Sequence, residues 1–198
     1  TIGVFHDWGD FGRLVEEGVA DEKLDPGAED ETTAAAIDFI KTRQPELTFI
    51  HLDHVDHAGH ATGWVKDDEA CFTVDGCPYL EAVTHADALI SQILQAIEDA
   101  GMQDKTAVLI SADHGGMFVG HGGDTYDERC IPFFVSAPGV RPGMIERSVR
   151  IFDVPATAAA LLGLELPQGW VGRPVLDAFE GYTLPQASTP LIDYQMVT

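Results

Sequence analysis

Basic residues are scarce in this chain. Its 198 residues include 11 Lys and Arg against 33 Asp and Glu, which gives a formal net charge of -22 at pH 7. Such a chain does not bind nucleic acid through a basic surface, because Lys and Arg are needed to neutralise the phosphates. The acidic residues are spread along the chain rather than gathered in a tail. They indicate either a self-repelling, soluble surface or adaptation to high salt.

Long apolar runs are missing as well. No stretch of about 18 or more apolar residues exists, so the sequence predicts no membrane span. The hydrophobic fraction of 45% and the length are still sufficient for a sizeable core. The chain begins at Thr1, directly on an apolar strand, and we therefore expect a fragment or a processed product.

Cysteine is also rare, with three residues in all. Cys71 and Cys77 flank a turn-like segment and are either a disulfide, which implies an oxidising compartment, or two unrelated thiols. No second Cys or His pair is spaced to join them in a metal site. Cys130 precedes an apolar run and is expected in the core. We expect an exported protein, periplasmic or extracellular, and leave a cytoplasmic location open.

Apolar, partly β-branched runs alternate with helical patterns. The expected strands span 2–5, 47–52, 107–111 and 130–136, and the expected helices 11–17, 31–43, 78–100 and 151–162, with an acidic loop at 21–30. This alternation predicts an α/β fold with a largely parallel sheet and helices on both faces. We expect residues 1–178 to form one domain with an exposed insert near 66–77, and residues 179–198 to form an irregular tail.

The segment 78–100 is the clearest helix. Pro78 suits its first turn, Gly101 suits its end, and apolar residues recur every three or four positions. They are expected to form one continuous face: Leu80, Val83, Ala86, Leu89, Ile90, Ile93, Leu94 and Ile97. His85 on this helix is interpreted as a surface or capping residue rather than a ligand.

The most unusual stretch is 49–63, which reads FIHLDHVDHAGHATG. It places four histidines and two aspartates between His51 and His60, directly after a run expected to be a buried strand. Packing does not explain this density, since charged side chains are seldom buried together unless something holds them. Ligands bind at the carboxyl ends of strands in open α/β sheets, so the stretch predicts a binding site.

A second apolar run, 107–111, is followed by the same residue types. Asp113 and His114 lead into two glycines, and His121 lies within a Gly-His-Gly-Gly sequence. Glycine lets the backbone turn tightly and approach a ligand closely. Two strands are therefore expected to deliver Asp and His to one place.

Asp56 and His60 are spaced so that one helical turn or a tight loop puts both on the same side. His121 can add a third ligand, and two imidazoles with one carboxylate leave a position open, as in catalytic zinc sites. At a strand end followed by glycines, Asp113 and His114 can converge on one ion. Each histidine alone is more often structural, but the joint pattern predicts a metal site with mixed ligands that suit Zn²⁺ or Mn²⁺.

These motifs resemble the alkaline phosphatase superfamily, specifically its type I phosphodiesterase/nucleotide pyrophosphatase branch. The resemblance covers nearly the whole chain and matches the C-terminal part of that family's catalytic domain. The matching motifs are Asp56-His57-Ala58-Gly59-His60 with Gly63, Ser111-Ala112-Asp113-His114-Gly115-Gly116, Gly120-His121-Gly122-Gly123, Asp153-Val154-Pro155-Ala156-Thr157 and Leu161-Leu162-Gly163.

The resemblance implies two divalent metal ions, Zn²⁺ in the first place and Mn²⁺ as the alternative. It divides the ligands into two sets: Asp56, His60 and His121 for one ion, and Asp113 and His114 for the other. Asp53, His54 and His57 match no ligand position, and we expect Asp53 or His57 to support ligands or to face solvent.

The implied activity is hydrolysis of phosphate esters, namely phosphodiesters or nucleotide pyrophosphates, by two metals and a Thr or Ser nucleophile. The family has that nucleophile and one more Asp ligand upstream of the part matched here. Within the chain, Thr1, Thr62 and Ser111 are poor candidates. We therefore expect this chain alone to be inactive and to need an N-terminal segment of the same protein as its partner for a small-molecule phosphoester. The alternatives are a sulfatase or phosphonate hydrolase, and a non-catalytic metal-binding fragment.

Overall fold

The computed structural model of the chain describes residues 1–64 and 76–181. The chain divides into two compact units: Thr1–Thr106 with Ala112–Pro132, and Ala107–Ser111 with Phe133–Thr198. Most of the predicted insert near 66–77 and of the tail 179–198 lies outside the described residues, and so does Cys71 of the predicted disulfide. The grouping of residues 1–178 into one catalytic domain stays a prediction.

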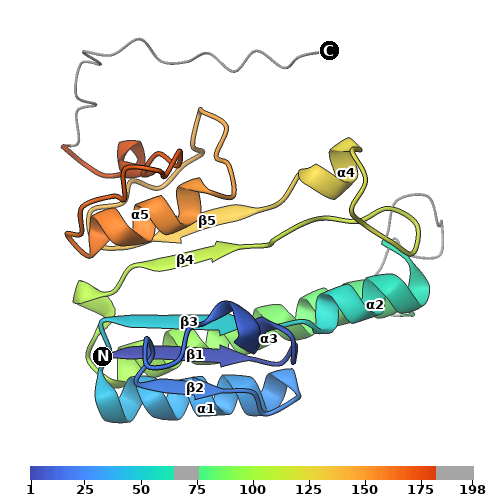
Figure 1. Cartoon of the computed structure of the whole chain (residues 1–198), viewed down its shortest axis with the longest axis horizontal. Coiled ribbons are helices and arrows are strands. Elements are labelled where there is room, and N and C mark those ends of the chain that lie inside the picture. Colours follow the sequence, from blue (N-terminus) through green and yellow to red (C-terminus); the bar gives the residue numbers. More distant parts are fainter. Residues whose placement is uncertain (65–75, 182–198) are drawn as a thin grey trace. The chain divides into compact units, whose positions relative to one another are not determined.

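The first unit contains a three-stranded parallel sheet, drawn as neighbouring arrows in Figure 1. β1 (Ile2–His6) lies between β2 (Glu22–Leu24) and β3 (Leu47–His51). The register pairs His6 with His51, so β1 and β3 end side by side. Whatever follows these two strands is therefore delivered to the same edge of the sheet.

One face of this sheet packs on α1 (Glu29–Arg43). The ring of Phe39 lies 5.4 Å from the ring of Phe5, and both side chains are buried. Gly3 completes the contact, because a Cβ there would lie 2.5 Å from the Phe39 ring. The first unit thus has its core between β1 and α1, as the apolar positions of both segments predict.

Two further helices of the first unit are α2 (His54–Thr62) and α3 (Pro78–Asp99), and α3 packs against both α1 and α2. Pro78 stands in the first turn of α3, and Gly101, just after its end, has a positive φ of 65°. Both ends agree with the predicted helix.

The buried side of α3 differs in part from the predicted apolar face. Leu89 and Ile97 are buried as expected, whereas Val83 and Leu94 are exposed. The helix instead buries the small residues Ala82 and Ala96. Small side chains let helices approach closely, and the predicted face included Ala86 but not these two alanines.

Two predictions for the N-terminal region were wrong in detail. The stretch 21–30, expected as a loop, contains β2 and the first residues of α1; β2 is exposed throughout, so no apolar pattern marks it. The helix expected at 11–17 is a single 3-10 turn, η1 (Phe11–Leu14). The Phe11 ring stacks on the Phe49 ring at 5.0 Å, which places η1 against the sheet.

Residues 112–132 return to the first unit as a long loop with one short helix, α4 (Tyr126–Arg129). A capping box begins it: the Glu128 amide donates to Thr125 Oγ1, and the Thr125 amide donates to the Glu128 carboxylate at 3.2 Å. The Gly123 amide donates to the same carboxylate at 2.8 Å. The cap therefore also fixes the residues just after His121.

The second unit pairs β4 (Val108–Ser111) with β5 (Phe133–Ser136) in antiparallel orientation, and α5 (Asp153–Leu161) contacts β4. The last predicted strand thus begins at Phe133 rather than at Cys130. Cys130 is exposed, not in the core as expected, because it caps the end of α4 and precedes the strand. The remaining 3-10 turns are η3 (Gln103–Lys105) and η4 (Leu176–Ala178).

Asp153, which belongs to one of the matching motifs, is buried at the start of α5 and serves the structure of the second unit. Its carboxylate accepts hydrogen bonds from the amides of Arg150 and Arg173 at 3.0 and 2.7 Å. The guanidinium of Arg147 donates to it at 3.2 Å. The carboxylate is thus fully occupied by partners within its own unit.

The predicted fold class is confirmed: the chain is α/β, with a parallel sheet on which α1 packs and further helices beside it. The pair β4–β5 is the antiparallel exception. Among the residues that are described, no helix combines the length and the apolar character needed to cross a membrane.

Candidate metal centre

α2 carries the polar run that follows β3 and presents Asp56 and His60 one turn apart. Nε2 of His60 lies 3.4 Å from Oδ2 of Asp56. This is the arrangement that the spacing of the two residues predicts. Because the helix starts three residues after the strand ends, both side chains lie near the carboxyl edge of the parallel sheet.

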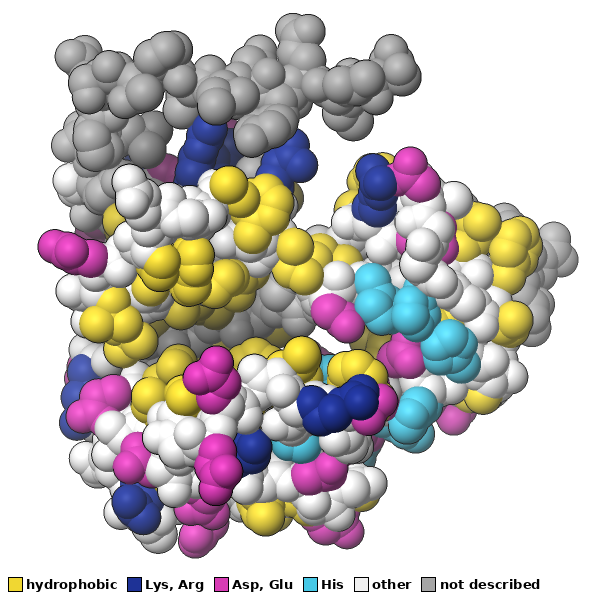
Figure 2. Space-filling model, viewed as in Figure 1, with side chains coloured by type: hydrophobic (Ala, Val, Ile, Leu, Met, Phe, Trp, Pro, Cys, Tyr) yellow, Lys and Arg dark blue, Asp and Glu magenta, His cyan; other side chains and the backbone are white. Residues whose placement is uncertain are grey.

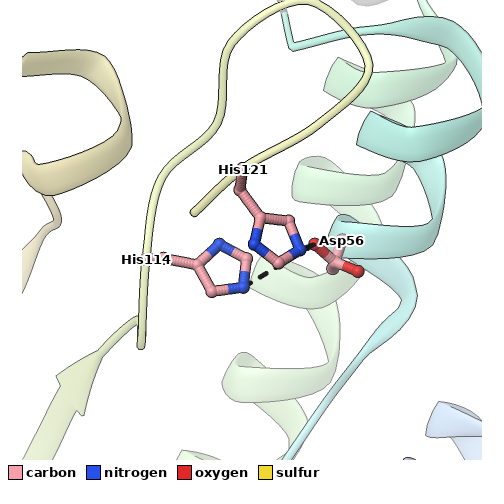
Figure 3. Close-up of side chains that lie close together, drawn as sticks. All are labelled: Asp56, His114 and His121. Carbon is pink, nitrogen blue, oxygen red and sulfur yellow. Dashed lines mark ion pairs between the residues drawn. The ribbon is translucent and has the colours of Figure 1, made fainter. Parts of the chain in front are cut away.

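The loop before α4 brings two more histidines to this place. Nε2 of His121 lies 3.5 Å and Nε2 of His114 lies 3.9 Å from Oδ1 of Asp56. The two imidazole rings stack on each other, with centroids 3.7 Å apart. Figure 3 shows both rings directing a nitrogen from the loop toward the carboxylate on α2. We call Asp56, His60, His114 and His121 the Asp56 cluster.

Backbone carbonyls set the tautomers of two of these histidines. Nδ1 of His60 lies 2.9 Å from the Val119 carbonyl oxygen, and Nδ1 of His114 lies 2.9 Å from that of Gly115. A carbonyl only accepts hydrogen bonds, so each Nδ1 carries the proton and donates. In the neutral ring Nε2 then keeps its lone pair, which is the form that binds a metal.

The donor set fits a divalent cation. Oδ1 of Asp56 is buried and has no hydrogen-bond partner among the described residues. A buried carboxylate oxygen without a partner is costly, and an ion between it and the two imidazoles would satisfy it. The ligand atoms of Asp56, His114 and His121 all lie within 4.8 Å of one another. Zn²⁺ and Mn²⁺ accept this mixture of oxygen and nitrogen ligands.

Asp113 stands at the margin of the Asp56 cluster. Its Oδ2 is 3.5 Å from Nε2 of His114, but its side chain is 70% exposed. Its Oδ1 accepts a hydrogen bond from the His114 amide at 3.0 Å. Four of the five predicted ligands therefore gather, with Asp113 next to them. His114 lies with Asp56 and His121 rather than apart from them, and the division into two ion sites stays a prediction.

Trp64 holds the two halves of the cluster at their spacing, a role that the sequence did not reveal. A Cβ on Gly59 of α2 would lie 2.5 Å from the indole, and one on Gly116 of the loop 2.1 Å from it. The Trp64 amide also donates to the Phe118 carbonyl at 2.8 Å. A glycine in each metal motif thus makes room for the same ring. Only the pairing of an aromatic residue with glycines in both motifs could have suggested it.

The other polar residues of the run form a network beside the cluster. Nε2 of His57 lies 3.0 Å from Oδ2 of Asp53, and the His57 side chain is 67% exposed, so it faces solvent as expected. The carboxylate of Asp7 lies 3.6 Å from Nδ1 of His51 and raises the pKa of that imidazole. Burial raises the pKa of Asp53, while His57 and His51 act to lower it.

The candidate nucleophiles of the first unit are poorly placed. The ammonium group of Thr1 pairs with Glu46 at the amino end of β1, whereas α2 follows the carboxyl end of β3. The hydroxyl of Thr62 donates to the Ala58 carbonyl at 2.9 Å within its own helix. Ser111 is the last residue of β4, in the second unit.

The Asp56 cluster is open to solvent. His60, His114 and His121 keep 45%, 28% and 31% of their side-chain area exposed. Figure 2 shows histidine side chains gathered at the surface. A small polar ligand can therefore reach the imidazoles without displacing the fold.

A sequence model described as type I phosphodiesterase/nucleotide pyrophosphatase matches residues 8–131, which include the whole Asp56 cluster. The chain belongs to this family. The type I phosphodiesterase match ends before β5 and α5, so it rests mainly on the first unit.

Two curated relatives carry different activities in their names. GPI ethanolamine phosphate transferase 1 of Emericella nidulans is 28% identical over 173 residues, 75% of this chain and 18% of its own length. Arylsulfatase K of Xenopus laevis is 28% identical over 109 residues, 50% of this chain and 20% of its own length. The chain spans 18% to 28% of the length of these curated relatives and the others it matches.

The fold of the type I phosphodiesterase chain agrees with that of solved structures. A protein of the alkaline phosphatase superfamily from Vibrio parahaemolyticus has a TM-score of 0.64 at 14% identity, with coverage of 87% of this chain and 46% of the other. The alkaline phosphatase superfamily inferred from the motifs is thereby confirmed.

Proposed function

We propose that the protein containing this chain is a metal-dependent hydrolase of phosphate esters, acting on phosphodiesters or nucleotide pyrophosphates. The observation that carries the proposal is the buried oxygen of Asp56, which has no hydrogen-bond partner in the described part of the chain and faces two imidazoles. Membership of the type I phosphodiesterase family supports the reaction class. The solvent-open histidines suit a small-molecule phosphoester.

In this proposal five side chains hold two ions, Zn²⁺ or Mn²⁺: Asp56, His60, Asp113, His114 and His121. A bound divalent ion would polarise a phosphoryl oxygen and stabilise the charge that develops on it. The carboxylate of Asp56 supplies negative charge for the cation. The carbonyls of Val119 and Gly115 hold two imidazoles in the accepting tautomer and fix their rings.

The proposal assigns the nucleophile, a Thr or Ser, to a part of a longer protein outside residues 1–198. Two observations support this assignment: the Thr62 hydroxyl already donates a hydrogen bond within its own helix, and the Thr1 ammonium group pairs with Glu46 at the amino end of β1. Loss of a covalent nucleophile lowers the rate by roughly 10⁴-fold or more in serine hydrolases. We therefore expect the 198-residue chain to bind metal without hydrolysing phosphodiesters.

A sulfatase is the second candidate, and the arylsulfatase K relative favours it. Sulfate and phosphate esters both present a tetrahedral, anionic group, so the same donors would serve either substrate.

The test compares the 198-residue chain with a longer version that includes upstream sequence. Both are stripped with a chelator, reloaded with Zn²⁺ or Mn²⁺, and assayed with bis(p-nitrophenyl) phosphate and p-nitrophenyl sulfate. We expect metal-dependent turnover of the phosphodiester by the longer version alone. Faster turnover of the sulfate ester would establish the sulfatase. Bound metal without turnover of either ester by the longer version would contradict both hydrolase candidates for these esters and favour the non-catalytic module.

A further inference from the structure

A second group of potential ligands lies on the side of the first unit where α1 begins. Glu29 and Asp30 are the first two residues of α1, and His85 lies on α3, which packs beside it. Nε2 of His85 is 3.0 Å from Oδ2 of Asp30 and 3.4 Å from Oε1 of Glu29. The three ligand atoms lie within 4.8 Å of one another. We call these residues the Glu29 group.

Glu29 supplies the observation that points to a ligand. Its side chain is only 7% exposed, and its Oε2 is buried without a hydrogen-bond partner among the described residues. Burial of a carboxylate with an unsatisfied oxygen is costly, and carboxylates in such surroundings are usually paired or bound to a metal. A glutamate at the start of a helix needs no burial to interact with the helix dipole, so capping does not explain its position.

The cavity around Glu29 is strongly acidic. It has a volume of about 430 Å³, and Asp7 and Asp53 are also among its lining residues, together with His54 and His57 of α2. No Lys or Arg is among its lining residues in the described part of the chain. A cavity with four carboxylates and no fixed cationic side chain attracts divalent cations.

A hydrogen bond from His85 does not give every buried carboxylate oxygen of the Glu29 group a partner. Its Nε2–H can donate to Asp30, the nearer carboxylate, or share its proton with Oε1 of Glu29. In either case Oε2 of Glu29 keeps no donor. A cation held between the carboxylates and the imidazole would engage all three side chains.

The Glu29 group is separate from the Asp56 cluster. At 100° per residue, His54, which lines the acidic cavity, is turned about 160° from Asp56 and about 120° from His60 around the axis of α2. His57, which also lines the cavity, lies between His54 and His60, about 60° from His60. The two sets share no ligand.

We propose that Glu29, Asp30 and His85 bind a divalent transition-metal ion that ties the start of α1 to α3. Two carboxylates and one imidazole suit Mn²⁺ or Zn²⁺, because Mn²⁺ binds carboxylate oxygen well and Zn²⁺ binds imidazole nitrogen well. The site lies at an interhelical contact and has no role in the proposed hydrolysis. The His85 side chain is 43% exposed, which agrees with the predicted surface position, and the proposal adds a ligand role to it.

The test counts Mn²⁺ bound by the full 198-residue chain, from the electron paramagnetic resonance signal of the ion left free. An Asp56→Ala/His114→Ala/His121→Ala background removes ligands of both ions proposed for the Asp56 cluster, so that the binding that remains reports the Glu29 group. In this background we expect one bound Mn²⁺. Glu29→Gln should weaken that binding by at least about 10-fold, since even groups that only support a ligand contribute 10- to 100-fold.

Glu31→Gln is the matched control, because it removes the same charge from an exposed residue in the same turn of α1. Its Mn²⁺ binding should equal that of the background. His85→Ala provides a second loss variant that leaves buried Glu29 unchanged, and circular dichroism checks the fold of each variant. Equal Mn²⁺ binding by the Glu29→Gln, His85→Ala and Glu31→Gln variants would overturn the proposal. The Glu29 group would then be only an ion pair of His85 with the two carboxylates.

Discussion

The indole of Trp64 occupies the space that a side chain on Gly116 would need, since a Cβ there would lie 2.1 Å from the ring. Gly59 on α2 stands in the same relation to the indole. The ring therefore lies between α2, which carries Asp56, and the loop that carries His114. The spacing between these two ligands depends on a residue that binds no metal.

Gly116→Ala is expected to lower the free energy of unfolding by about 1–3 kcal/mol, because the added methyl group overpacks against a rigid ring. Urea denaturation measures the loss. Gly120→Ala in the same loop is the control, since a Cβ there meets nothing within 4 Å and its φ is not positive. An equal loss in both variants would show that the Trp64 contact is not the cause.

Asp56→Asn is expected to lower the affinity of the Asp56 cluster for Zn²⁺ by about 100-fold or more. The change removes the charge of a carboxylate that faces two imidazoles, and loss of groups that merely support ligands already costs 10- to 100-fold. Competition with a chromophoric chelator gives the affinity. Asp87→Asn, an exposed carboxylate on α3, is the matched control and should bind as the unaltered chain does.

Asp7→Asn is expected to reduce stability near pH 5.5 and to have little effect near pH 8.5, with chelator present. The Asp7 carboxylate raises the pKa of His51 above its ordinary value of 6.5. The protonated imidazole thus stabilises the fold below about pH 6.5, and this contribution is lost as the pH rises through the raised pKa of the folded state.

Thermal unfolding at the two pH values measures the effect of Asp7→Asn. The amide oxygen of Asn can still accept the hydrogen bond that the Asp53 amide donates, so the variant isolates the charge. Asp10→Asn, whose carboxylate pairs with Arg13 at the surface, is the control. A loss for Asp7→Asn that is the same at both pH values would contradict the assigned role of His51.

Thr125→Ala is expected to cost about 1 kcal/mol of stability, the usual cost of losing an N-cap hydroxyl. Because Glu128 also holds the Gly123 amide, the variant should loosen the backbone next to His121 and weaken Zn²⁺ binding. Thr125→Ser keeps the hydroxyl and should restore both properties. Unfolding by urea and Zn²⁺ titration are the two measurements, and normal Zn²⁺ affinity in Thr125→Ala would disprove the coupling.

The ligands of the Asp56 cluster were accessible from the sequence because their positions follow from local geometry. Asp56 and His60 face one way through helical spacing, and His114 and His121 lie in a glycine-rich loop. The sequence does not show which of these ligands lie together in the folded chain. The stacking of His114 on His121 and the marginal position of Asp113 depend on how the loop folds back, and no periodicity encodes that.

Long amphipathic elements were likewise easier to predict than short or polar ones. The helix starting at Pro78 has its own start and stop signals, whereas the exposed strand Glu22–Leu24 has no apolar pattern to mark it. The Glu29 group was not predicted from the sequence for a different reason. Glu29 and His85 are far apart in the sequence and meet only because α1 packs on α3, which pairs an acidic helix start with one histidine.

The Trp64 contact also limits how the chain can diverge. The glycines at positions 59 and 116 lie in different motifs, yet the same ring excludes a side chain from both. As long as residue 64 is a tryptophan, neither glycine can be replaced by alanine without steric strain. A lineage that replaced the tryptophan by a smaller residue would be released from both restrictions at once, so the three positions are expected to change together across descendants of this sequence.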